Sequence, residues 1–115
     1  MTWQEKIIAA HTAVTDSVSH YYKLKSERYF VWQEEAGADL VAEGVHAERA
    51  VRGTTDLYTK TEDDPWRAAF EAALDAAGIA WYWNSTSYEE ATGYIHTEWV
   101  WEVVNGEEAD DDGQL

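Results

Sequence analysis

The stretch from Tyr94 to Val104 (YIHTEWVWEVV) constrains the fold most, because its side chains alternate along the chain with the two-residue period of a β-strand. A second apolar run, from Ile79 to Tyr88, precedes it across the turn Glu89–Gly93, so the two runs predict a β-hairpin. An alternating strand buries one face against other elements, so we expect a sheet covered on one side. One face of the last strand carries Ile95, Thr97, Trp99, Trp101 and Val103, and the other carries Tyr94, His96, Glu98, Val100 and Glu102.

The chain begins with a predicted helix. Thr2 and Glu5 have the spacing of a capping box, in which each residue satisfies a free backbone amide of the other. We place the end of this helix near residues 17–19, because Asp and Ser are weak helix formers. Its apolar stripe recurs at steps of three and four residues: Trp3, Ile7, Ala10, His11, Val14 and Val18.

A second helix is predicted over residues 64–78. Asp64 can cap it, Pro65 takes the first helical position, where a missing amide costs nothing, and Gly78 ends it. Its apolar positions follow helical spacing: Trp66, Ala69, Phe70, Ala73, Leu74 and Ala77. We expect Trp66, Phe70 and Leu74 to pack on sheet residues including Tyr29, Val31 and Trp99 or Trp101.

The middle of the chain predicts three more strands. Tyr29–Gln33 (YFVWQ) is dense in β-branched and aromatic residues, and the turn Glu34–Ala38 follows it. Leu40–His46 and Thr54–Lys60 are the other two, with a bulge or loop expected over Arg49–Gly53. The expected fold is therefore α+β, in the order α-β-β-β-α-β-β: an antiparallel sheet with two helices packed on one face.

Residues 1–104 are expected to form one domain, because two separate cores would each be marginal in 115 residues. Residues 105–115 (NGEEADDDGQL) have five acids and no apolar pattern, which predicts a mobile acidic tail. The absence of cysteine excludes disulfides and thiolate metal sites. The first apolar run, Ile7–Ala10, is too short for a signal peptide or a membrane span, so we expect a soluble protein with no membrane partner.

The net charge of −15 comes from 23 acidic and 8 basic residues. The five acids of residues 105–115 explain only part of it, because 18 acids against 8 bases still give −10. Binding to a phosphate backbone depends on Lys and Arg, so this charge predicts repulsion of nucleic acid. Solubility alone is the simpler interpretation of the acidity. The sharper one is a surface that must not adhere to DNA.

Seven Trp and seven Tyr are many for a chain of this length. Such side chains fill cores, but they are also enriched at protein interfaces, since they combine a large rigid surface with a polar group. One small core hardly holds seven Trp, so we expect some of them at an interface.

No catalytic, cofactor or metal site is recognisable in the sequence, and we expect a protein that is not an enzyme. The four histidines lack metal-binding spacing, and His11, on the helix stripe, is expected to be packed in the core. There is no nucleophile motif and no phosphate-binding glycine loop. The adjacent carboxylates fall in predicted turns, where charges are ordinarily solvated: Glu34-Glu35, Asp63-Asp64 and Glu89-Glu90.

Several sequence segments, together with the predicted order of helices and strands, resemble those of a known protein family. They are the short leading helix, the strands RYFVWQEE and TTDLYTKTE, DPW at the start of the second helix, and the hairpin GIAWYW…YEEATGYIHTEWVWEV. Residues 1–104 thereby resemble the tail terminator proteins of long-tailed bacteriophages and prophages, also called tail completion or tail-to-head joining proteins. The acidic tail is not part of the resemblance.

The resemblance implies a structural virion protein. Such proteins form a ring, usually a hexamer, that caps the tail tube, stops its polymerisation and meets the head connector, while DNA passes through the lumen. The implied partners are other copies of the chain, the tail tube protein and the connector proteins, with no cofactor. The implied location is the head-proximal end of the tail, after assembly in the bacterial cytoplasm. Six copies at −15 would carry −90, and a negative lumen would keep DNA from adhering.

Another class also fits the charge. An acidic protein that mimics DNA, and so inhibits a DNA-binding partner, needs no catalytic site either; it would be a monomer or dimer that competes with DNA. A ring instead requires two different complementary surfaces on each subunit. The candidate interface residues are Arg28, Arg49, Arg52, Trp81, Trp83, Tyr94, His96 and Val100.

Overall fold

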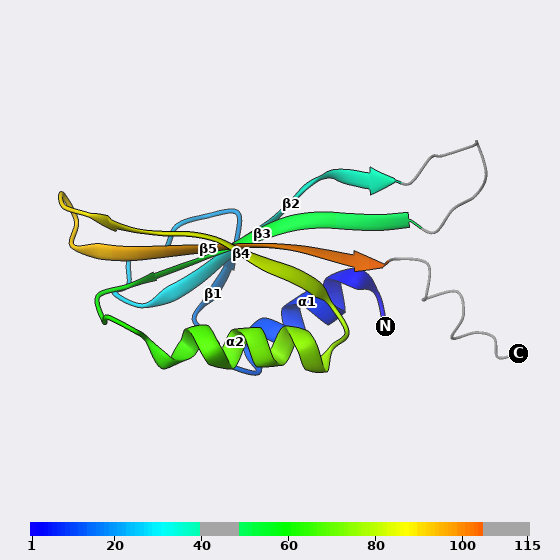
Figure 1. Cartoon of the computed structure of the whole chain (residues 1–115), viewed down its shortest axis with the longest axis horizontal. Helices are drawn as coiled ribbons and strands as arrows, with labels where there is room; N and C mark the ends of the chain where they lie inside the picture. The colour runs from blue at the N-terminus through cyan, green and yellow to red at the C-terminus, as the bar shows by residue number, and fades with distance from the viewer. Residues whose placement is uncertain (40–48, 105–115) are drawn as a thin grey trace, which may run out of the picture.

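Both helices lie on the same side of a five-stranded sheet in the computed structural model, which describes residues 1–39 and 49–104 (Figure 1). The strands are arranged in the order β1-β2-β3-β5-β4, and the predicted α+β class and order of elements are confirmed. Neither of the two helices in residues 1–39 and 49–104 has the length and apolar composition of a membrane span. The elements are α1 (Trp3–Thr12), β1 (Val18–His20), β2 (Tyr29–Asp39), β3 (Arg49–Thr59), α2 (Pro65–Ala76), β4 (Ala80–Glu89) and β5 (Tyr94–Val104).

The first helix is shorter than predicted, and the sheet is mixed rather than wholly antiparallel. Helix α1 ends at Thr12, and the chain then turns into the short strand β1, which runs parallel to β2. The Thr15 hydroxyl accepts the amide of Ser17, and the Ser17 carbonyl accepts the amide of Phe30. Hydroxyl side chains compete with helical hydrogen bonds in this way, and the prediction of helix through residues 17–19 was therefore wrong.

Strands β2 and β3 are both longer than predicted. The predicted turn Glu34–Ala38 is strand, and so is Arg49–Gly53, where a bulge or loop was expected; the two segments pair with each other. The register shifts between Glu34 and Gly37, where β2 has one residue more than β3. A β-bulge accommodates such an extra residue, so the pairing of β2 with β3 continues beyond it. The predicted strand Leu40–His46 lies outside the described residues, as does the tail 105–115.

The capping signals of both helices are confirmed. The Thr2 hydroxyl accepts the Glu5 amide at 3.1 Å, and the Thr2 amide donates to the Glu5 carboxylate at 2.8 Å. The Asp64 carboxylate accepts the Trp66 amide at 2.9 Å, with Pro65 beginning α2. Gly78 has a φ of 72°, the left-handed conformation that ends a helix and that glycine adopts without strain.

The side of the sheet under the helices, here called the helix face, holds the main core. Phe70 on α2 is fully buried, with its ring 5.0 Å from that of Phe30 and 5.1 Å from that of Trp99. This confirms that α2 packs on Trp99. The core also includes Ile7, Leu57, Leu74, Ile79, Trp101 and Val103.

The opposite side is here called the outer face. It carries the residues of β5 that alternate with those on the helix face. Tyr29 and Val31 lie here in a smaller cluster with Tyr58, so the prediction that they pack under α2 was wrong. Phe30 and Trp32 take that place, because a run in which every residue is apolar gives no sign of which residues face the helices. The segment between β1 and β2 covers one end of this face, where Leu24 packs on the tyrosines.

Candidate protein interface

Candidate residues Arg52 and Val100 meet on the outer face, near the ends of the strands away from the β4–β5 turn. Arg52 donates to the Glu102 carboxylate from both Nε and Nη2, the latter at 2.9 Å. Together with Tyr82 they line a hollow of about 150 Å³. The hollow combines an aromatic ring, an aliphatic side chain and one exposed ion pair, which suits contact with a protein surface.

Candidates Tyr94 and His96 lie at the opposite end of the outer face. The imidazole of His96 stacks on Tyr58 with the ring centroids 4.4 Å apart. Its Nε2 lies 2.7 Å from Asp56 Oδ1, and its Nδ1 lies 3.4 Å from Glu89 Oε2. The hydrogen bond to Asp56 and the negative charges around it raise the pKa of His96 above its ordinary value.

Tyr94 makes several contacts within its own chain. Its hydroxyl donates to the carbonyl of Ser26, and its ring packs edge-on against Tyr29 and Tyr58. The Lys60 ammonium lies 4.6 Å from the centroid of the Tyr94 ring. These contacts fix the segment between β1 and β2 over the sheet, so Tyr94 has a structural role at this end.

The edge strand β4 carries the two tryptophan candidates, and they differ. Trp81 is partly buried against the main core, and its indole N–H donates to Asp75 at 2.8 Å. Trp83 is half exposed and donates to the Thr86 hydroxyl at 2.9 Å. Two neighbours that the sequence analysis did not select, Tyr82 and Tyr88, are 56% and 63% exposed. Their place on an edge strand explains this exposure, and the order of strands in the sheet is not readable from their sequence.

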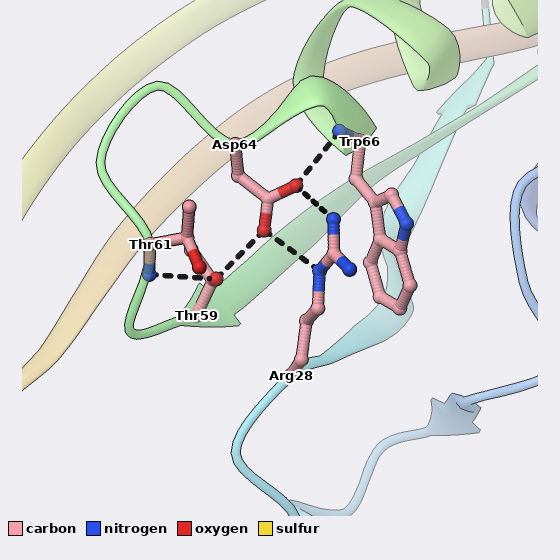
Figure 2. Close-up of polar contacts among 5 residues, drawn as sticks. All are labelled: Arg28, Thr59, Thr61, Asp64 and Trp66. Atoms are coloured by element: carbon pink, nitrogen blue, oxygen red, sulfur yellow. Dashed lines mark hydrogen bonds and ion pairs between the residues drawn. The ribbon is translucent and has the colours of Figure 1, made fainter.

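Arg28 lies beside the first turn of α2 (Figure 2). Its Nε donates to the buried carboxylate of Asp64 at 2.9 Å, and its guanidinium carbon lies 3.9 Å from the centroid of the Trp66 ring. The Thr59 hydroxyl donates to the same carboxylate at 2.7 Å. Burial alone would raise the pKa of Asp64, but the hydrogen bonds from Arg28, Trp66 and Thr59 hold it below its ordinary value. Arg28 therefore joins the β1–β2 segment to α2 within one chain.

The histidines outside the interface list make internal contacts. His11 is fully buried, as expected for a core residue; its Nδ1 donates to the Ile7 carbonyl and its Nε2 lies 2.9 Å from the Thr55 hydroxyl. His20 lies between the rings of Tyr21 and Trp32, with 3.8 Å to each centroid, and its Nε2 is 2.7 Å from Glu34. Across residues 1–39 and 49–104, no group of three His, Cys, Asp or Glu side chains is placed to hold a metal ion.

The eight candidates thus do not form a single patch. Arg52 and Val100 share one end of the outer face, Tyr94 and His96 the other, Trp81 and Trp83 belong to the β4 edge, and the guanidinium of Arg28 is bonded to Asp64. The backbone of Arg49 pairs with Asp39 at the start of β3, and its side chain lies outside the described part of the structure.

No protein-family model matches this chain, and no curated protein matches its sequence.

Proposed function

We propose that this protein is a structural subunit of a phage or prophage virion: a tail terminator whose copies assemble into a ring, with six as the expected number. The ring caps the tail tube and joins it to the head connector. The resemblance of residues 1–104 to tail terminators supports this function, and so does the exposed β4 edge.

The observation that carries the proposal is an uncharged aromatic edge in a strongly acidic chain. From Ala80 to Tyr88 the sequence AWYWNSTSY contains no Asp, Glu, Lys or Arg, whereas the whole chain has a net charge of −15. Three large aromatic side chains on this strand are at least half exposed: Tyr82, Trp83 and Tyr88. Exposed aromatic rings are typical of protein interfaces, and like charges would repel other copies elsewhere on the surface.

A ring around DNA gives the acidity a use. Each added copy brings a net charge of −15, and a lumen lined by such a surface repels the DNA that passes through it. The same repulsion opposes assembly between copies. At physiological ionic strength the repulsion between copies is screened over about 8 Å. Close apolar contacts at the β4 edge can therefore offset this repulsion.

The DNA-mimic alternative has less support on the outer face. A protein that imitates DNA presents carboxylates free to meet a partner's cations, in place of phosphates. On this face the carboxylates of β3, β4 and β5 each have a partner within the chain. The pairs are Asp56 with His96, Glu89 with His96, Glu98 with Asn84, and Glu102 with Arg52.

The composition of virus particles tests this function. Phage or induced prophage particles from the source strain are purified, their proteins identified by mass spectrometry, and the junction of head and tail reconstructed by cryo-electron microscopy. We expect the chain as a ring between the tube and the connector. Its absence from intact particles would contradict the proposal.

A further inference from the structure

His96 lies on the outer face where three neighbouring strands meet. It belongs to β5, its partner on β3 is Tyr58, and its partner on β4 is Ser87. Its two ring nitrogens lie beside carboxylates on different strands. Nε2 is 2.7 Å from Asp56 Oδ1 on β3, and Nδ1 is 3.4 Å from Glu89 Oε2 at the end of β4. One imidazole therefore connects all three strands.

The number of carboxylates that this ring can hold depends on its protonation. An imidazolium carries a proton on each nitrogen and can donate to Asp56 and Glu89 together, whereas a neutral imidazole has a single N–H. The shorter distance to Asp56 favours keeping that proton on Nε2. The unprotonated Nδ1 then faces the Glu89 carboxylate as one acceptor facing another. Loss of one proton thus leaves Glu89 without its cationic partner.

The side chain of Glu89 connects the turn between β4 and β5 to the sheet. Its Oε1 accepts the Thr92 hydroxyl at 3.1 Å, while its Oε2 lies beside His96. The Glu89 carbonyl also accepts the amide of Gly93 at 2.7 Å, and the Lys60 ammonium donates to the Thr92 carbonyl at 2.7 Å. Glu89 is therefore the link between the protonation of His96 and the turn residues 90–93.

The negative charges around His96 favour the imidazolium. The hydrogen bond to Asp56, and then the charges of Asp56, Glu89 and Glu98, raise the pKa of His96 above its ordinary value of 6.5, although burial opposes this. Glu98 lies two residues along β5, and its carboxylate also accepts a hydrogen bond from Asn84. The ring is therefore still charged at a pH where a free histidine has lost half of its protons.

Two cations near this end of the outer face oppose the protonation of His96. The Lys23 ammonium lies 5.3 Å from the centroid of the Tyr58 ring, and the Lys60 ammonium lies 4.6 Å from that of Tyr94. Burial raises the pKa of Tyr58, so the phenol that stacks on the imidazole stays neutral while His96 titrates. The carboxylates outweigh the two cations, because only they contact the imidazole nitrogens.

We propose that His96 is a pH-dependent clasp on the β4–β5 hairpin: its imidazolium holds Asp56 of β3 and Glu89 of β4 together, and loss of its proton releases Glu89 and loosens the turn. The clasp is closed at low pH and opens as the pH rises through the titration of His96 in the folded protein. This device acts within a single chain, so it does not depend on the proposed ring.

A simple ion pair between His96 and Asp56 is the competing arrangement. Such a pair would also raise the pKa of His96, but the turn would then not respond to the proton. Glu89 distinguishes the two arrangements, because only the clasp uses its carboxylate.

An NMR titration that follows His96 and the turn in the same samples tests the clasp. The His96 ring signals report its protonation, and the order parameter of the Thr92 methyl group reports the motion of the turn without exchange with solvent. Glu89→Gln keeps nearly the same size and an oxygen for the Thr92 hydroxyl, but it has no charge to hold the imidazolium. Glu90→Gln removes one charge from the next residue, which is exposed in the turn, and is the matched control.

In the natural protein we expect the Thr92 methyl order parameter to fall with the same midpoint as the His96 titration. Glu89→Gln should lower the His96 midpoint and make the order parameter independent of pH, whereas Glu90→Gln should behave like the natural protein. A Thr92 methyl group that does not respond as His96 titrates would overturn the clasp. So would a Glu89→Gln variant that titrates like Glu90→Gln, because the ion pair with Asp56 would then explain the whole shift.

Discussion

The indole of Trp101 lies directly over Gly53, its partner on the neighbouring strand β3, and occupies the space where any other residue would place its first side-chain carbon. A Cβ built on Gly53 would lie 2.3 Å from Cη2 of Trp101 and 2.6 Å from the Gln33 carbonyl oxygen. The same indole N–H donates to the Thr55 hydroxyl at 2.8 Å. The glycine thus lets one large ring pack flat on the sheet and reach a buried polar partner.

Gly53→Ala is expected to destabilise the protein by about 1–3 kcal/mol, because the ring and the β2 backbone must both move to make room. Urea denaturation of the variant and of the exposed-strand control Ser87→Ala measures this cost. The control should change little. A Gly53→Ala variant as stable as the natural protein would show that Trp101 does not lie over the glycine.

Phe70→Ala should cost about 3–5 kcal/mol, because this fully buried ring fills the space between Phe30 and Trp99. Ala68→Ser, on the exposed side of the same helix, is the control and should stay within about 0.5 kcal/mol. Thermal or urea melts compare the two. Equal melting curves would remove Phe70 from the core and contradict the packing of α2.

His11 makes the stability depend on pH. Burial lowers the pKa of His11 from its ordinary value of 6.5 to about 4. Below pH 6.5 the unfolded chain gains a proton on His11 that the folded protein does not take up, and this proton favours the unfolded state. The free energy of unfolding is therefore unaffected by His11 above pH 6.5 and decreases as the pH falls toward 4. The loss amounts to roughly 3 kcal/mol for this residue.

Histidine NMR titration provides the direct measurement. The His11 ring signals should stay in the neutral form at pH 5, while those of His96, whose pKa is raised, should change at a higher pH than in a model peptide. His96 acts in the opposite direction, since its stabilisation is present at low pH and lost as the pH rises through its folded pKa. A His11 signal that titrates near 6.5 would contradict the buried hydrogen bonds to Ile7 and Thr55.

Duplex DNA should not bind measurably near physiological salt, because the net charge of −15 repels the phosphate backbone. Fluorescence anisotropy of a labelled duplex gives the affinity. Two of the basic residues between β1 and β2 are engaged within the chain: the Lys23 ammonium lies 5.3 Å from the centroid of the Tyr58 ring, and Arg28 is paired with Asp64. Micromolar binding would refute this expectation.

The elements with strong periodicity were predictable from the sequence. The hairpin of β4 and β5, both helix N-termini and the glycine at the end of α2 appear where their patterns placed them. The predicted end of α1 was wrong, because the residues after the helix pair with β2 as a strand. The turn predicted after Gln33 was also wrong, because this segment pairs with β3 across a bulge.

The interface was less predictable, since exposure depends on the order of strands. Trp81 and Trp83 have the same character in the sequence, yet Trp81 packs on the core, while Trp83 is half exposed. Tyr82 and Tyr88 were missed because nothing in residues 80–88 shows that β4 lies at the edge of the sheet. Arg28 was named as a candidate interface residue, and its pairing with Asp64, distant in sequence, emerges only from the fold.

Self-association is the central claim, and light scattering coupled to size exclusion across a salt series tests it most directly. Repulsion between copies at −15 each should keep the 13.1 kDa chain monomeric or weakly associated at low salt. As added salt screens these charges, we expect a single closed species, with six chains the expected number. A mass of one chain at every salt concentration, together with absence from purified particles, would contradict the ring and favour an acidic protein that mimics DNA.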